Sequence, residues 1–275
     1  MNDILIRTWV LLRGNWILLS ILILETLVML VFKGGQVGLT PNLFQEMALY
    51  FFHLAVLGGW LYQMKTVILH PNHRTGWDDF FNGVARYARQ LIGGGAMFML
   101  VCLLGGILAL GVAGGLAGPP DMKLMDQIWQ LLQANKMHEL EVLMQQQSAA
   151  FQQLEQWLAS FLAGLALLGL YTMTLCFWTH WCVLADSSWI RAWSRSQQIL
   201  RKHWKPLLWL GMIWAAPTLL IHVGILSGIS ALAILAFFLS LLAKTYFTLL
   251  FCLFLCELEP ADVAPLLAPT APPKP

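Results

Sequence analysis

The chain has 275 residues, of which 59% are hydrophobic and only 11% are charged, and its mean hydropathy is +0.69. A soluble domain carries about 25% charged residues, because its surface must stay hydrated. The composition therefore excludes an ordinary soluble domain and predicts an integral membrane protein. The net charge is only +2, and we expect membrane lipids, and no nucleic acid, as partners.

Six apolar segments are long enough to cross a bilayer as helices. A span needs about 20 apolar residues, since the hydrocarbon core is about 30 Å thick and a helix rises about 1.5 Å per residue. We therefore expect an all-α fold, a polytopic transmembrane bundle within a single domain of residues 1–256. The predicted spans are 14–32, 45–68, 91–117, 157–185, 206–227 and 229–256.

Lysine and arginine are unequally divided between the two sides of this topology. With the N-terminus in the cytoplasm, twelve of them fall on the cytoplasmic side and three, Lys33, Lys123 and Lys136, fall outside. Cytoplasmic loops of membrane proteins carry an excess of these residues. We therefore expect a multi-pass protein of the bacterial inner membrane with both termini in the cytoplasm.

Three similar segments precede the first, third and fifth spans. Residues 6–16 contain I-R-T-W and then L-R-G-N-W, residues 190–204 contain I-R-A-W and then L-R-K-H-W, and residues 77–91 are aromatic and basic. Such segments are typical of interfacial helices and indicate three related units, each an interfacial helix followed by two spans. They either only anchor the topology or also contact lipids or a partner, through Arg7, Arg13, Arg86, Arg89, Arg191, Arg195, Arg201 and Lys202.

Two charged residues lie near the middle of spans, Glu25 in the first and Lys244 in the sixth. A charge at this depth costs several kcal/mol, so it normally faces the protein interior and finds a partner. We expect Glu25 and Lys244 to form an intramembrane ion pair. The pair either fixes the register of the two helices or forms a proton or substrate site.

Three histidines also fall within predicted spans, namely His53, His180 and His222. Neutral imidazoles on facing helices can hold a haem iron, so His53 and His222 are a possible pair of axial ligands. The simpler interpretation is that each histidine makes a polar contact between helices. We predict no metal site and no cofactor other than this haem alternative.

Two further segments lie outside the predicted spans. Pro119-Pro120 ends the third span, Asp121 can cap a new helix, and a second helix is expected from near Met137. Residues 119–156 are therefore expected to form an extramembrane helical hairpin. Residues 257–275 are rich in proline and alanine, a composition typical of a disordered tail.

Two of these motifs carry a family resemblance. Ala192-Trp193-Ser194-Arg195-Ser196, followed by Leu200, Lys202 and Trp204, precedes a predicted hairpin of spans, and Phe80-Phe81-Asn82-Gly83 with Arg86 and Tyr87 is the equivalent middle element. The layout resembles uncharacterised bacterial six-span families related to the membrane domain of glycerophosphodiester phosphodiesterase. The resemblance covers about residues 76–256 and implies their architecture without the catalytic phosphodiesterase domain.

These observations favour a non-enzymatic membrane component that assists or organises partner proteins or lipids. Its partner would be another membrane protein or a second copy of the chain. One alternative is the membrane subunit of a transporter that uses Glu25 and Lys244. A second alternative is a haem-binding membrane protein.

Overall fold

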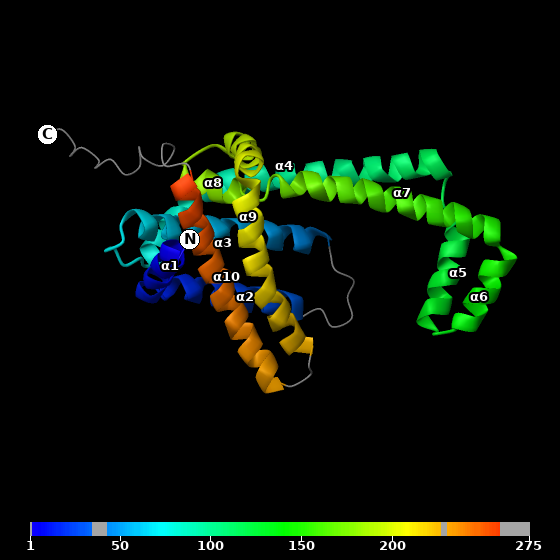
Figure 1. Cartoon of the computed structure of the whole chain (residues 1–275), viewed down its shortest axis with the longest axis horizontal. Coiled ribbons are helices and arrows are strands. Elements are labelled where there is room, and N and C mark those ends of the chain that lie inside the picture. Colours follow the sequence, from blue (N-terminus) through cyan, green and yellow to red (C-terminus); the bar gives the residue numbers. More distant parts are fainter. Residues whose placement is uncertain (1, 35–42, 227–229, 259–275) are drawn as a thin grey trace. The chain divides into compact units, whose positions relative to one another are not determined.

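The chain is all-α, as the composition and hydropathy predict (Figure 1). The computed structural model describes residues 2–34, 43–226 and 230–258, and within these ranges no strand occurs. The helices are α1 (Asn2–Gly14), α2 (Ile17–Gly34), α3 (Leu43–Leu69), α4 (Trp77–Ala117), α5 (Met122–Gln133), α6 (Met137–Gln146), α7 (Ser148–Met173), α8 (Trp178–Leu184), α9 (Trp189–Leu226) and α10 (Ser230–Leu258).

The chain divides into two compact units. The first comprises Met1–Gly95 and Cys176–Pro275, and the second comprises Ala96–Leu175. The first unit therefore contains α1, α2, α3, α8, α9, α10 and the beginning of α4, whereas the second contains the rest of α4 with α5, α6 and α7. The predicted tail has only its first two residues within α10, and residues 259–275 lie outside the described part.

Three helical stretches in the described part are long and apolar enough to cross a membrane: Trp77–Ala117, Ser148–Leu184 and Leu235–Leu258. The pair Asp3–Gly14 and Ile17–Met29, bent by 73°, adds a fourth if it acts as one span. These stretches define a helical membrane protein. The helix α3, which corresponds to the predicted span 45–68, is not among them, because its polar side chains lower its hydropathy.

The helical backbone is interrupted at the same position in both copies of the L-R-x-x-W motif. The break between α1 and α2 falls at Asn15, and α9 is kinked at His203, whose φ of −124° is not helical. Asn15 Nδ2 donates to the Leu11 carbonyl at 3.0 Å, while Pro206 lacks an N–H and its ring collides with the carbonyl four residues earlier in a straight helix. In contrast, α4 continues through its aromatic segment without a break.

Small residues let helices α3 and α4 approach closely in the first unit. A methyl group at Gly59 would lie 2.7 Å from the Phe80 carbonyl oxygen, and one at Gly83 would lie 2.9 Å from Gly59 Cα. Such close backbone approach is typical of helix packing in membranes, where dispersion replaces the hydrophobic effect. Trp60 Nε1 also donates to the Leu18 carbonyl at 2.8 Å, which joins α3 to α2.

The second unit is built on α4 and α7 in the same manner. A methyl group at Gly164 of α7 would lie 2.8 Å from Ala109 Cβ of α4. The two helices predicted within residues 119–156 are present as α5 and α6, and they pack against each other. Asp121 caps α5 by accepting hydrogen bonds from the backbone N–H groups of Lys123 and Leu124.

Candidate functional site

A buried ion pair joins α3 to the loop that follows α8. Lys65 Nζ donates to Asp186 Oδ2 at 2.7 Å and to the Val183 carbonyl at 2.9 Å. Only 7% of the Lys65 side chain and 21% of the Asp186 side chain are exposed. The ammonium therefore satisfies a carboxylate and a helix-terminal carbonyl at once, as a buried charge requires.

Two residues at the beginning of α4 complete this cluster. The Tyr87 hydroxyl donates to Asp186 Oδ1, and the Arg86 guanidinium lies 3.2 Å from the same oxygen. The Arg86 guanidinium also lies 5.6 Å from the centroid of the Tyr87 ring, a distance at which a cation is attracted to an aromatic face. We call Lys65, Arg86, Tyr87 and Asp186 the Asp186 cluster.

The local sequence holds Asp186 in place. The helix α8 ends at Leu184, and Asp186 adopts a left-handed backbone with φ of 48°, which aspartate tolerates better than most residues. The Ser187 N–H then bonds the Cys182 carbonyl at 3.1 Å, closing the last turn of α8 as left-handed C-terminal caps do. Cys182 Sγ in turn donates to Gln90 Oε1 at 3.3 Å, a second link from α8 to α4.

The segment that follows Asp186 in the chain lines a pocket with two arginines, which we call the arginine pocket. Its volume is about 370 Å³, and its walls carry two arginines, two serines and a glutamine. Arg195 donates to Gln198 Oε1 at 3.0 Å and its guanidinium lies 5.9 Å from the centroid of the Trp181 ring. The lining residues are Trp181, Ala185, Ser187, Arg191, Ser194, Arg195 and Gln198.

The eight basic residues predicted to contact lipids or a partner all have side chains that are exposed or half-buried. Seven are exposed and Arg195 is half-buried. Arg7 lies 3.6 Å from Glu257, and Arg86 belongs to the Asp186 cluster. The arginine pocket brings together Arg191 and Arg195, whereas Arg13, Arg89, Arg201 and Lys202 do not line it.

Glu25 and Lys244 are not brought together. The Glu25 carboxylate is buried and contacts Nδ1 of His53 on α3. Among the residues that the structure describes, no ion pair links Glu25 to Lys244. Because His53 follows Glu25 by 28 residues on the neighbouring helix, hydropathy alone could not select it as the partner.

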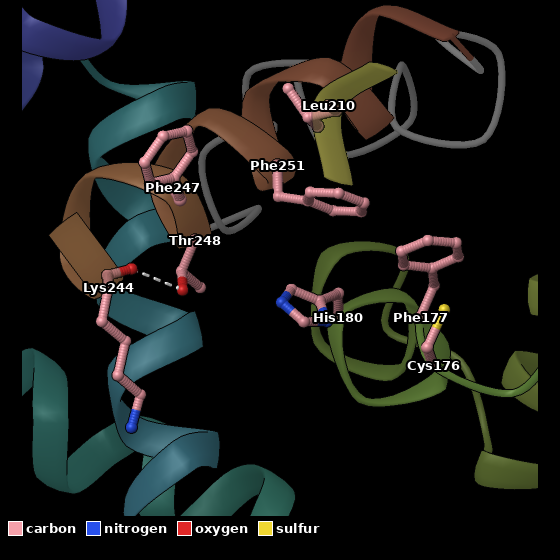
Figure 2. A pocket seen from close by; sticks show the side chains of 8 residues that line it. All are labelled: Cys176, Phe177, His180, Leu210, Lys244, Phe247, Thr248 and Phe251. Atoms are coloured by element: carbon pink, nitrogen blue, oxygen red, sulfur yellow. Dashed lines mark hydrogen bonds between the residues drawn. The ribbon is translucent and has the colours of Figure 1, made fainter. Parts of the chain in front are cut away.

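His180 and Lys244 instead border one cavity in the first unit, and both belong to stretches that are long and apolar enough to cross a membrane (Figure 2). The cavity has a volume of about 370 Å³ and lies among α8, α9 and α10. The Phe177 and Phe251 rings stack at 4.7 Å between centroids, and the His180 ring lies 5.9 Å from Phe251. The lining residues are Cys176, Phe177, His180, Leu210, Lys244, Phe247, Thr248 and Phe251.

The structure does not describe both histidines of the predicted haem pair, so the haem alternative stays a prediction. His53 Nδ1 is engaged by Glu25, and the side chain of His222 lies outside the described residues. Within the described part of the chain, no group of three or more histidine, cysteine, aspartate or glutamate residues could hold a metal ion.

Two features of the site were not predicted from the sequence. The sequence pattern indicates that Lys65 is a basic residue at the cytoplasmic end of a span and that Asp186 is an ordinary loop residue. One signal in the sequence could have indicated Asp186. It is a single carboxylate between an apolar span and an arginine-rich segment, fewer than ten residues before Arg191 and Arg195. Its partner, 121 residues away, could not be found from spacing.

The fold and these sites define a helical membrane protein with clusters of charged side chains between its helices. No family model, curated protein or solved structure matches the chain.

Proposed function

We propose that this chain is a non-enzymatic membrane component that binds the phosphate headgroups of anionic phospholipids in its arginine pocket and thereby assists or organises partner lipids or proteins. The observation that carries this proposal is the pairing of Arg191 and Arg195 around one polar pocket. The two residues are one helical turn apart, so their side chains project from the same face of α9.

The chemistry of the pocket suits a phosphate diester. Guanidinium groups bind phosphate oxygens through two parallel hydrogen bonds, and the Ser187 and Ser194 hydroxyls add neutral donors. Both arginines belong to the first turns of α9, which begins at Trp189. The unpaired N–H groups and the dipole at a helix N-terminus favour an anion there.

The proposed membrane topology places this pocket at the cytoplasmic surface. It has six spans, the predicted segments at 206–227 and 45–68 included, and both termini are cytoplasmic. The lysine and arginine bias supports this orientation. Exposed tryptophans in the basic segments, such as Trp9, Trp16 and Trp204, support a position of these segments at the membrane interface. Anionic lipid of the cytoplasmic leaflet attracts basic surface segments by about 1 kcal/mol per side chain.

The recurrence of a helix break at Asn15 and His203 supports the related units that the repeated motifs indicate. In each case a basic, tryptophan-bearing helical segment ends at the break and an apolar one follows, and the α1–α2 pair bends by 73°. An interfacial helix followed by a span requires such a turn, because the two run in different directions relative to the bilayer plane.

Native mass spectrometry of the detergent-solubilised protein tests the proposal. We expect phosphatidylglycerol to bind about tenfold more tightly than phosphatidylcholine, and this preference to disappear in the double variant Arg191→Gln/Arg195→Gln. The matched control, Lys123→Gln/Lys136→Gln, removes the same charge from the α5–α6 region and should retain the preference. Equal binding of the two lipids, or equal losses in both double variants, would overturn the proposal.

A second candidate function is transport, and the buried Glu25–His53 contact favours it. Ionisable residues within spans mark proton and substrate paths in transporters, and both of these residues lie in predicted spans. Proton uptake coupled to a substrate gradient in proteoliposomes, lost in Glu25→Gln, would move transport ahead of lipid binding.

A further inference from the structure

The cavity beside His180 and Lys244 has an apolar wall and one cationic edge. Figure 2 shows Phe177, Phe251 and His180 around the space, with the Lys244 side chain at one edge and its ammonium directed away from the rings. The volume of about 370 Å³ falls at the lower end of ligand pockets, which measure about 300–1,000 Å³. One narrow ligand therefore fits better than a two-chain lipid.

Lys244 lies at a depth where a cation needs a partner. It is the middle residue of α10, which has 29 residues, so it is about 20 Å from either end of that helix. A lysine side chain at that depth cannot easily reach the headgroups, although lysines near helix ends do so. Glu25 contacts His53 instead, and no described carboxylate forms an ion pair with Lys244.

We propose that this cavity binds a single-chain anionic amphiphile, namely a long-chain fatty carboxylate. Its chain lies against Phe177, Leu210 and Phe251, and its carboxylate extends past the edge of the cavity to the Lys244 ammonium, which points away from the rings. The ligand supplies the missing counter-charge, and the surrounding bilayer supplies the apolar path of entry. This site is distinct from the arginine pocket, and the inference does not depend on lipid headgroup binding there.

Two arguments favour a carboxylate on one chain. The aromatic walls offer flat apolar surface to an alkyl chain and few hydrogen bonds to a polar body, since His180 and Thr248 are the main polar groups beside Lys244. A single ammonium matches a single carboxylate charge, whereas the arginine pocket has the bidentate groups that phosphate prefers. The two sites therefore differ in the charge and the shape of the ligand that each one fits.

Photolabelling of the full-length protein with a diazirine-bearing palmitate tests the inference. We expect the label on peptides that contain Phe177 or Phe251, displacement by oleate, and displacement by methyl oleate at least about tenfold weaker. Phosphatidylglycerol should not displace the label. Equal displacement by methyl oleate, or displacement by phosphatidylglycerol as effective as by oleate, would overturn a single-chain carboxylate site.

Variants of the cavity complete the test. Lys244→Met should weaken palmitate labelling at least about tenfold, and Lys244→Arg should stay within about threefold of the wild type. Cys176→Trp fills the cavity from the α8 side and should abolish labelling without touching the cation. Unchanged labelling in Lys244→Met or in Cys176→Trp contradicts the inference. The thermal unfolding midpoint of each variant verifies its fold, and Lys244→Gln replaces any Lys244→Met protein that does not fold.

Discussion

Lys65 connects segments that are far apart in the chain, because its ammonium reaches the carboxylate of Asp186 and the carbonyl of Val183 at the end of α8. The Tyr87 hydroxyl binds the same carboxylate. Three separate stretches, α3, the beginning of α4 and the α8–α9 loop, thus depend on one acidic residue. Whether such a buried pair adds net stability depends on its geometry, but breaking it leaves a buried charge without compensation.

Asp186→Leu should therefore lower the free energy of unfolding by about 3–5 kcal/mol, because it leaves the buried Lys65 ammonium without a carboxylate. Lys65→Met should cost less, because Arg86 and Tyr87 still contact the Asp186 carboxylate. The double variant should lose clearly less than the sum of the two single variants, because Asp186→Leu no longer strands an ammonium once Lys65 is gone. Arg86→Gln is the control, since the Arg86 side chain is 57% exposed and should contribute about 0–1 kcal/mol. Unfolding in mild detergent measures these values, and strictly additive losses for the pair would contradict the assignment.

A second double-variant cycle separates the two possible partners of Glu25. Glu25→Gln and His53→Leu should couple by about 0.5–3 kcal/mol, because the two side chains are in contact. Glu25→Gln and Lys244→Met should be additive to within about 0.5 kcal/mol. The unfolding free energies of the single and double variants give both couplings. Coupling of Glu25 to Lys244, without coupling to His53, would restore the ion pair expected from the sequence.

At the scale of elements, hydropathy and motif spacing predicted where most of the long apolar helices lie. The positions of the helix breaks and the contacts between helices could be seen only in the structure. The predicted span 91–117 falls within α4, and residues 17–32 and 230–256 of two other predicted spans fall within α2 and α10. The exact positions of the breaks at Asn15 and His203 escaped prediction, because apolar periodicity does not report where backbone hydrogen bonds stop. The L-R-x-x-W motif indicated repeated segments, but only the structure places both breaks at its fourth residue.

Asn15→Ala should weaken the turn between α1 and α2. The Asn15 side chain donates to the Leu11 carbonyl and accepts from the Thr75 N–H and hydroxyl, so its removal leaves buried polar groups unsatisfied. We expect a loss of about 1–3 kcal/mol in the free energy of unfolding. Asn82→Ala, at an exposed position of α4, is the matched control and should change it by about 0.5 kcal/mol or less. Equal effects would refute the role of Asn15.

Gly59→Ala should disturb the packing of α3 against α4. The added methyl would lie 2.7 Å from the Phe80 carbonyl oxygen, and such overpacking typically costs about 1–3 kcal/mol. Gly106→Ala is the same change in a helix with nothing within 4 Å of the added methyl, and it should stabilise the protein by about 0.5–1 kcal/mol. Thermal unfolding of both variants compares them. A Gly59→Ala protein as stable as Gly106→Ala would contradict the close approach.

At the scale of the whole molecule, the all-α class and its membrane character follow from composition. Charged residues are too few to hydrate a globular surface, and three described stretches meet the length and hydropathy of a span. The sites were less accessible to sequence reasoning. Arg191 and Arg195 were selected with six other basic residues because they belong to basic, aromatic segments. The pairing of Lys65 with Asp186 and of Glu25 with His53 depends on tertiary structure between distant segments.

Cysteine labelling tests the proposed six-span topology. Single cysteines at Arg13, Arg89 and Arg201 should react with a membrane-impermeant maleimide only in inside-out vesicles, because basic segments stay in the cytoplasm. Cysteines at Lys123 and Lys136 should react only in right-side-out cells. The unmodified protein, whose five cysteines lie in apolar runs, provides the background. Labelling of all five positions from one side would exclude this topology.

The phospholipid that remains bound when the protein is isolated from its own membrane tests the central proposal most directly. Lipid extracted from the purified protein is identified by mass spectrometry and counted per chain. We predict about one tightly bound anionic phospholipid per chain, retained in Lys123→Gln/Lys136→Gln and lost in Arg191→Gln/Arg195→Gln. Zwitterionic lipid alone, or the same anionic lipid in both double variants, would contradict headgroup binding by the arginine pocket.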